Sequence, residues 1–289
     1  MTSAEQERRE ADLLDRVVRS FDDCPDPRLK QLMTALVRHL HAFARETQLT
    51  EDEWMAAVRW LTDTGRISDD KREEFILASD VLGLSMLVVA QNHRLDPSAT
   101  PATVLGPFHI DGSPEKAFGE DMSDGLPGEP LYVHGTVRAL DGTPVAGGVL
   151  DVWQSDADGA YEAQLPVDEA RLRPKYTSGA DGAYCLRTIA PLGYAIPMDG
   201  PVGRLIEQTD ISHYRPAHVH FLLAVPGYEP LVTHLFREGT EYLDSDVVFG
   251  VKDELVVAFE RHEPGPTPDG GTSDVPWLEA RYDFVLQPA

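Results

Sequence analysis

"RPAHVHFLLAV", residues 215–225, places two histidines one residue apart in an otherwise largely apolar run. The run predicts a β-strand, in which successive side chains point to opposite faces. His218 and His220 would therefore project from the same face, with β-carbons roughly 7 Å apart. The pair has two interpretations, as ligands of a metal ion or as packed core residues.

The second half of the chain has the pattern of an all-β domain. From about residue 130, short β-rich runs are separated by Gly, Pro and Asp at spacings of roughly eight to twelve residues. This spacing is typical of an antiparallel sandwich or barrel. The strands are predicted over residues 131–140, 149–156, 183–191, 217–225, 231–236, 251–261 and 281–287. The stretch 262–276 is predicted as a loop.

The first hundred residues have helical patterns. Asp26 followed by Pro27 is a helix start signal, and Thr50 with Glu53 forms a capping box for a helix that ends near Gly65. Residues 68–95 are apolar over most of their length and predict one buried helix. We therefore predict an α+β protein, with a helical domain over residues 1–105 and a β-sandwich domain over residues 106–289.

Composition narrows the class of partner. The 289 residues include 25 basic and 49 acidic side chains, for a net charge of −24. Such a surface repels nucleic acid and anionic lipid, so neither is expected as a partner. Cys24 and Cys185 lack any Cys-x-x-Cys spacing and are interpreted as free thiols. The chain has neither a signal-peptide pattern nor an apolar run long enough for a membrane span, and a cytoplasmic location is expected.

If the histidine pair binds a metal, the sequence pattern does not yet identify the other ligands. Zinc is the default metal for paired histidines, but a hydrolytic zinc site usually needs a third His, Asp, Glu or Cys. No spacing singles out one of the remaining candidates, His109, His134, His213 and His234. Tyrosine offers another solution, because a phenolate suits a trivalent metal such as Fe(III), which would lower the phenol pKa strongly.

One four-residue string, "DGAY", occurs twice, at residues 158–161 and 181–184. Asp-Gly predicts a turn at both places, so two hairpin turns are the simplest interpretation. An EF-hand calcium loop is not supported, because the closing glutamate and the following helix are missing.

Three longer motifs, "DVWQSDADGAYEAQ", "GYAIPMDGPVG" and "RPAHVHFLLAVPGYEPLVTHLF", resemble those of the intradiol ring-cleaving dioxygenases. The resemblance implies one non-haem Fe(III) per chain, held by Tyr161, Tyr194, His218 and His220. It also implies that Tyr184, in the second "DGAY", is structural. In this family the helical N-terminus forms a dimer interface, so a homodimer is expected.

Finer features are similar to the branch of this family that acts on hydroxyquinol (1,2,4-trihydroxybenzene), among them "TVLGPFHI" at residues 103–110. The resemblance implies a substrate pocket formed by Leu77, Asp80, Val104, Leu105, Gly106, Pro107, Ile196, Pro197, Arg215 and Val248. Leu105 departs from the aromatic residue that we associate with some members, and a leucine there would widen or reshape the pocket. Asp80 lies three residues after Leu77, hence on the same helical face, and is expected to bind the third hydroxyl. His234 would lie near the site with an open role.

The expected reaction opens hydroxyquinol between its 1,2-diol carbons with O2 to 3-hydroxy-cis,cis-muconate, which tautomerises to maleylacetate. Arg215 would stabilise developing negative charge, and Tyr194 would accept a substrate proton. The nearest alternative is the same reaction on catechol or a chlorocatechol. Alternatives of another class are a zinc hydrolase built on the paired histidines and a metal-free β-sandwich binding module.

Overall fold

The computed structural model describes residues 2–93, 96–167 and 169–289. Contacts between Cα atoms divide the chain into two units, which meet between Thr62 and Asp63 inside the third helix. Each unit is described by itself below. The boundary predicted between residues 105 and 106 divides the chain by type of secondary structure, since it separates the first five helices from the first strand. It stays a prediction.

The first unit begins with α1 (Ser3–Arg19) and α2 (Pro27–Thr47), followed by the start of α3 (Glu51–Ile67). The predicted start signals are confirmed. The Asp26 side chain accepts the backbone N–H groups of Arg28 and Leu29, while Thr50 and Glu53 bond each other reciprocally. These contacts satisfy N–H groups that have no partner within the helix.

The apolar face of α2 is incompletely covered in the single chain. None of its residues is buried. Five of its large apolar side chains are about half exposed: Leu29, Leu32, Leu36, Leu40 and Phe43. A regular row of this kind marks an amphipathic helix whose apolar stripe normally packs on another surface.

The prediction of one continuous buried helix over residues 68–95 was wrong. The structure has two helices there, α4 (Glu74–Val81) and α5 (Leu84–Asn92), separated by Gly83 at φ +69°. Residues before α4 form a turn instead, because the Asp69 side chain accepts the N–H groups of Lys71 and Arg72. The expected burial holds for α4 but not for α5, which buries no residue. Residues 94 and 95 lie outside the described part.

Within the described residues, no single helix has both the length and the apolar composition to cross a membrane. Helices α4 and α5 meet the criteria of length and apolar composition only when they are taken as a pair, and the two helices are bent by 82° relative to each other.

The second unit is built on two five-stranded sheets. One has the order β10-β13-β1-β14, with β4 also paired to β1, and the other has the order β3-β2-β7-β8-β9. The strands of the first sheet are β1 (Pro130–Ala139), β4 (Ala183–Ile189), β10 (Glu260–His262), β13 (Trp277–Arg281) and β14 (Phe284–Leu286). Those of the second are β2 (Val149–Trp153), β3 (Lys175–Thr177), β7 (His218–Ala224), β8 (Leu231–Arg237) and β9 (Val256–Val257).

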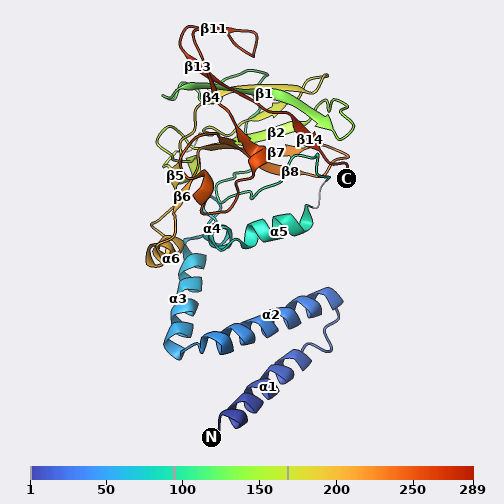
Figure 1. Ribbon diagram of the computed structural model, residues 1–289, viewed down its shortest axis with the longest axis vertical. Helices are drawn as coiled ribbons and strands as arrows, with labels where there is room; N and C mark the ends of the chain where they lie inside the picture. Colours follow the sequence, from blue (N-terminus) through green and yellow to red (C-terminus); the bar gives the residue numbers. More distant parts are fainter. Residues whose placement is uncertain (1, 94–95, 168) are drawn as a thin grey trace. The chain divides into compact units, whose positions relative to one another are not determined.

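Short elements connect and flank these sheets. Two small antiparallel sheets have two strands each: β5 (Tyr194–Ala195) pairs with β6 (Tyr214–Arg215), and β11 (Gly265–Pro266) pairs with β12 (Thr272–Ser273). The remaining elements are α6 (Pro201–Thr209), η1 (Glu162–Gln164), η2 (Leu243–Ser245) and η3 (Asp253–Leu255). Figure 1 shows α4, α5 and α6 on the side of the β2–β7–β8 sheet that faces away from β1.

The predicted sandwich is confirmed, with two differences. The sheets are mixed, because β1 pairs in parallel with β13 and β14, as does β8 with β9. The predicted loop at residues 262–276 contains the β11–β12 hairpin, whose turn is closed by the Asp269 side chain accepting the Gly271 N–H. Sequence periodicity does not reveal strand direction, since parallel and antiparallel strands alternate in the same way.

The core lies between the two sheets and orients the central strand. Val219, Phe221 and Leu223 of β7 belong to one buried apolar cluster with Leu131 and Val133 of β1. Because side chains alternate along a strand, His218 and His220 must point out of the other face of β7. The hydrophobic core therefore determines the face on which the two imidazoles lie.

Candidate active site

Two histidines and one tyrosine converge on a single point outside the second sheet. The Nε2 atoms of His218 and His220 lie 3.0 Å apart. The hydroxyl oxygen of Tyr161 lies 3.4 Å from His218 Nε2 and 3.1 Å from His220 Nε2. All three side chains are at most 2% exposed. Three donor atoms that approach one another this closely surround a volume of the size of one ion.

The first "DGAY" turn delivers Tyr161 to this point. The Asp156 side chain accepts the N–H groups of Asp158 and Ala160, which shapes the turn. Gly159 has φ +84°, and a β-carbon there would lie 2.8 Å from the β-carbon of Tyr194. Glycine is therefore required at this position both by the backbone conformation and by the close approach of Tyr194.

Tyr194 flanks the same group. It lies on β5, directly paired with Arg215 on β6. Its ring centroid is 5.3 Å from that of Tyr161 and 5.7 Å from that of His218. The structure thus brings the four predicted metal ligands together. Tyr184 of the second "DGAY" lies in the sandwich core instead, where its hydroxyl donates to the Tyr282 carbonyl at 2.8 Å.

Burial holds the side chains of this group in their neutral forms when no cation is present. Burial, together with nearby Arg215, lowers the pKa of His218 far below its ordinary value, and burial likewise lowers the pKa of His220. His218 Nδ1 donates to the Pro216 carbonyl at 2.7 Å, so its Nε2 presents a lone pair inward. Burial also raises the pKa of Tyr161. Neutral imidazole nitrogens and phenol oxygens that face one another fit a bound metal, which would lower the phenol pKa.

A third histidine lies behind the pair. His234 of β8 is directly opposite His220 in the sheet, and its ring centroid lies 4.2 Å from that of His220. Ligand atoms of His218, His220 and His234 all lie within 4.8 Å of one another. His234 Nδ1 also lies 3.4 Å from Arg215 Nη2. His234 therefore lies next to both a candidate ligand, His220, and Arg215.

Arg215 is buried and held in one orientation. It is 3% exposed, and its Nε donates to Asp246 Oδ1 at 3.0 Å. Its Nη1 lies 3.1 Å from His218 Nε2. Burial lowers the pKa of the guanidinium, but Asp246 and other nearby groups outweigh this and raise the pKa above its ordinary value. Arg215 therefore carries a permanent positive charge into the site.

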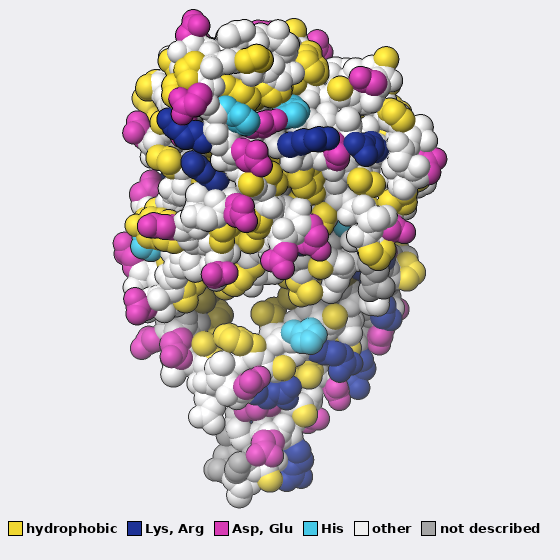
Figure 2. Space-filling model, turned by 45° about the horizontal axis from the view of Figure 1, so that its top comes forward, with side chains coloured by type: hydrophobic (Ala, Val, Ile, Leu, Met, Phe, Trp, Pro, Cys, Tyr) yellow, Lys and Arg dark blue, Asp and Glu magenta, His cyan; other side chains and the backbone are white. Residues whose placement is uncertain are grey.

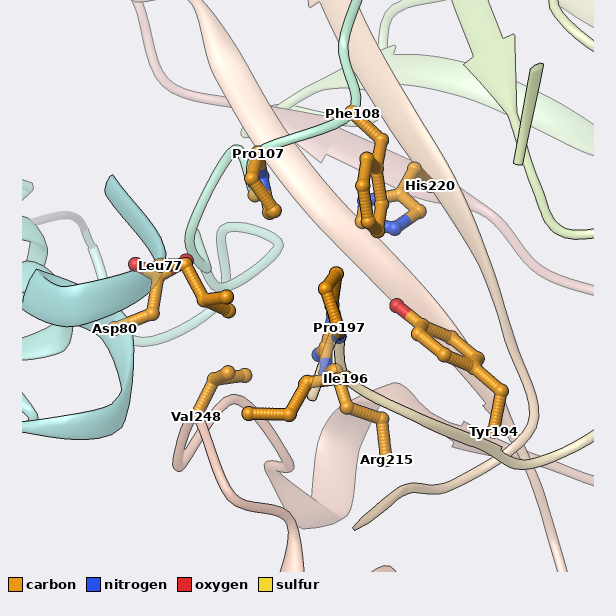
Figure 3. A pocket seen from close by; sticks show the side chains of 11 residues that line it. Leu77, Asp80, Pro107, Phe108, Tyr194, Ile196, Pro197, Arg215, His220 and Val248 are labelled. Atoms are coloured by element: carbon orange, nitrogen blue, oxygen red, sulfur yellow. The ribbon is translucent and has the colours of Figure 1, made fainter. Parts of the chain in front are cut away.

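Tyr194, Arg215 and His220 open into a small pocket beside this group. Figure 3 shows Leu77 and Asp80 on one side of it and Tyr194 and His220 on the other. Its walls are formed by Leu77, Asp80, Gly106, Pro107, Phe108, Tyr194, Ile196, Pro197, Arg215, His220 and Val248. Two predicted residues, Val104 and Leu105, are not among them. Leu105 packs instead against the cluster of Phe108, Trp153, Tyr161 and Tyr194.

Asp80 is the unusual polar group of this pocket. It is 1% exposed, and neither carboxylate oxygen has a hydrogen-bond partner among the described residues. Ser85 is close enough to lower its pKa, but the Ser85 hydroxyl donates to Ser79 at 2.8 Å. The effect of burial is larger than the lowering effects of Ser85 and Arg215, and it raises the pKa of Asp80 to about 6. An unpaired buried carboxylate is costly, and it is therefore poised to bind a ligand hydroxyl.

A charged network holds the wall formed by Ile196 and Pro197. Arg72 donates to both carboxylate oxygens of Asp199, at 2.9 and 2.8 Å, and also to the buried Glu74. The other oxygen of Glu74 accepts the Val202 N–H in the first turn of α6, at 3.0 Å. A β-carbon at Gly200 would lie 2.2 Å from that oxygen, so only glycine fits there.

Sequence reasoning missed Phe108, Asp246 and the Arg72 network. Phe108 follows Gly106 and Pro107 directly, so extending that motif by one residue would have included it. Asp246 lies two residues before Val248, in "DSDVVFG", and carries no signal that distinguishes it from the other acidic residues. Arg72 and Asp199 are 127 residues apart, and no local pattern connects them.

Comparisons with known proteins give matches along most of the chain. Residues 104–288 match a family described as "Dioxygenase", and residues 26–100 match one described as "Catechol dioxygenase N terminus". The chain is 51% identical to a hydroxyquinol 1,2-dioxygenase of Nocardioides simplex, over 99% of this chain and 98% of the relative. It is 48% identical to a 6-chlorohydroxyquinol 1,2-dioxygenase of Cupriavidus pinatubonensis, over 98% and 99%.

Solved structures extend the likeness to the fold. A hydroxyquinol 1,2-dioxygenase from Pseudomonas putida DLL-E4 superposes with a TM-score of 0.88 at 46% identity, covering 98% of this chain and all of the other. A catechol 1,2-dioxygenase from Pseudomonas arvilla C-1 gives a TM-score of 0.83 at 27% identity, covering 97% and 91%.

Proposed function

The chain belongs to the intradiol ring-cleavage dioxygenases, and on this basis we propose that it opens hydroxyquinol between its two adjacent hydroxyl-bearing carbons. The product of this cleavage with O2 is 3-hydroxy-cis,cis-muconate, which tautomerises to maleylacetate. The observation that carries the choice of substrate is Asp80, an unpaired carboxylate in the pocket wall. A trihydroxybenzene has a third hydroxyl to donate to it, and catechol has none.

The preference would arise because the buried Asp80 carboxylate has no hydrogen-bond partner unless the substrate provides one. A site built to bond a hydroxyl rejects an analogue that lacks it, because the buried polar group is then left unsatisfied. Relatives named for hydroxyquinol reach 41–51% identity to this chain, whereas one named for catechol reaches 36%. Both observations favour hydroxyquinol over catechol and chlorocatechols, which remain the second candidates.

We propose that the metal is one Fe(III) per chain, held by Tyr161, Tyr194, His218 and His220. Two phenolates and two neutral imidazoles are a donor set that suits a trivalent cation, and the donor atoms of Tyr161, His218 and His220 already lie within 3.4 Å of one another. A hydrolytic zinc site built on the same histidines would need no tyrosine ligand. When bound, ferric iron would supply the activation of the diol toward O2.

The surrounding residues would handle protons and charge. The phenol oxygen of Tyr194, beside the pocket, would accept a proton from a substrate hydroxyl on binding. Arg215, fixed by Asp246, would stabilise negative charge that develops on the ring oxygens, without reorganising during the reaction. The apolar walls formed by Leu77, Ile196 and Val248 would exclude bulk water and hold the ring.

We also propose that the protein forms a homodimer through its N-terminal helices. The half-exposed apolar row on α2 supports this, since a second copy would cover it. Sedimentation velocity would show a monomer for Leu36→Asp and a dimer for the unaltered protein. A reducing compartment such as the cytoplasm is proposed from the two free thiols, Cys24 and Cys185.

The test is a substrate panel on the iron-loaded enzyme. We expect hydroxyquinol to exceed catechol and 4-chlorocatechol in kcat/KM by at least two orders of magnitude. Replacing Asp80 by Leu should reduce kcat/KM for hydroxyquinol by about 10²-fold or more while that for catechol is retained. Asp70→Leu, at an exposed position, is the matched control. A selectivity that does not change in Asp80→Leu would contradict the assignment.

A further inference from the structure

A second group of histidine and carboxylate side chains lies on the first sheet, on its outer face. Glu260 and His262 of β10 and Glu279 of β13 each offer a ligand atom, and these three atoms lie within 4.8 Å of one another. Figure 2 shows imidazole and acidic side chains side by side on this upper face of the molecule. The shared core separates this group from His218 and His220, which face outward from the second sheet.

Strand register brings the group together. Glu260 is the direct antiparallel partner of Glu279, and His262 pairs with Trp277 two residues away along the same face. The intervening Leu278 and Ala280 point into the core. Two carboxylates directly opposite each other on one face of a sheet repel, unless a positive charge lies between them.

A neighbouring strand orients the central carboxylate. His134 of β1 and Glu279 Oε1 are hydrogen-bonded at 2.7 Å, and because a carboxylate oxygen accepts, His134 Nε2 donates. Glu279 is thereby held with its other oxygen, Oε2, directed toward His262. A histidine that fixes a carboxylate in this way is a common second layer around protein metal sites.

The contact between His262 and Glu279 does not have the geometry of a hydrogen bond. His262 Nε2 lies 2.7 Å from Glu279 Oε2, yet this nitrogen has no hydrogen-bond partner among the described residues. Nitrogen and oxygen donors bound to one Zn²⁺ at about 2.1 Å in a tetrahedral shell lie about 3.4 Å apart, so the two atoms are close enough to share a cation after a small outward shift. The Nε2 atoms of His218 and His220 show the same relationship, at 3.0 Å. Trp277 stacks on His262 with centroids 4.4 Å apart and fixes its ring.

We propose that Glu260, His262 and Glu279 bind a divalent cation of the zinc type, with His134 as a positioning residue. One imidazole and two carboxylates are a donor set for Zn²⁺ and similar first-row ions. The cation would neutralise the carboxylate pair and join β10, an edge strand of its sheet, to β13. The site is independent of ring cleavage.

The test is a titration of the iron-loaded enzyme with Zn²⁺ at pH 7.5, followed by isothermal calorimetry. We expect one Zn²⁺ per chain with micromolar affinity, while the visible absorption of the iron stays unchanged and excludes exchange at the first site. Glu260→Gln and His262→Gln should each weaken zinc binding at least 10-fold, and His134→Gln about 10- to 100-fold. The exposed neighbour Glu263→Gln should bind as the unaltered protein does.

Ring-cleavage activity of all four variants should match that of the unaltered enzyme, which shows that each is folded. The proposal is wrong if the unaltered enzyme takes up no zinc beyond its iron site at 100-fold excess. It is equally wrong if Glu260→Gln and His262→Gln bind zinc as the unaltered enzyme does. Either result would mean that His134, His262 and Glu279 form only ion pairs.

Discussion

Arg215 and Asp246 form an ion pair that is almost completely buried, with side-chain exposures of 3% and 2%. Asp246 also accepts the N–H group of Gly250 at 3.0 Å, so the same carboxylate shapes the loop that carries Val248. A buried arginine without this partner would be both destabilised and free to turn. Asp246 therefore connects the position of the Arg215 guanidinium to the wall of the pocket.

Replacing Asp246 by Asn should reduce kcat by about 10²-fold, because the Arg215 guanidinium loses its orientation toward the substrate. The free energy of unfolding should fall by roughly 3–5 kcal/mol, since a buried charge is left unpaired. Iron content should be retained. Steady-state kinetics, urea unfolding and metal analysis check these three outcomes. Asp244→Asn, an exposed neighbour, is the control, and an unchanged kcat in Asp246→Asn would refute the positioning role.

The two copies of "DGAY" provide a matched pair of substitutions. Tyr161→Phe should bind iron poorly and lose or shift the red absorption that tyrosinate gives to ferric iron. Tyr184→Phe should keep both iron and colour, and lose only about 1 kcal/mol through its hydrogen bond to the Tyr282 carbonyl. Visible spectra of the purified variants decide between them. A bleached Tyr184→Phe beside a red Tyr161→Phe would show that the second copy, and not the first, carries the ligand.

Three buried histidines lie close enough to share a metal, but only two are assigned as ligands. We expect His218→Ala and His220→Ala each to lose iron and activity together, because each removes a neutral donor. His234→Gln should keep its iron, since its assigned contact is with Arg215. Iron content per chain is the measurement. Full loss of iron in His234→Gln would make it the third imidazole ligand.

The pKa of Asp80 predicts how stability depends on pH. Its carboxyl titrates at about 6 in the folded chain, above the ordinary value of 3.8. The folded state therefore binds more protons between these values, and the raised pKa costs stability as pH increases through this window. Asp80→Asn removes the cost, so it should be more stable than the unaltered protein by roughly 3 kcal/mol at pH 8 and about half of that at pH 5. Urea unfolding at both values is the check, and an equal difference at both would disprove the titration.

The Arg72 network predicts an effect on substrate binding away from the metal. Arg72→Gln leaves the buried Glu74 without its charge partner and releases Asp199, so the Ile196–Pro197 wall should become mobile. We expect KM to rise several-fold with little change in iron content, and stability to fall by roughly 3 kcal/mol. Lys71→Gln, next to it and exposed, should behave normally. An unchanged KM would restrict the network to a structural role.

Local patterns are sufficient for most of the helices and strands and for the face on which the histidine pair lies. Alternation along residues 218–224 is enough to place both histidines on one face of the strand, because strand geometry fixes that relationship. The helix starts at Asp26 and Thr50 follow from side chains that satisfy the first N–H groups. The break at Gly83 does not follow from the sequence, since an apolar run does not show where packing requires a turn.

What the sequence by itself determined is the α+β order, the strand that carries the histidine pair and, through motif resemblance, the family. What only the tertiary structure decided is which distant residues share the pocket. Asp246 reaches Arg215 across 31 positions, and Arg72 reaches Asp199 across 127. The cluster of His134, Glu260, His262 and Glu279 depends on the pairing of β1, β13 and β10. Such contacts arise because the sheets pack on a common core, which selects strand neighbours by shape and burial and leaves no periodic trace along the chain.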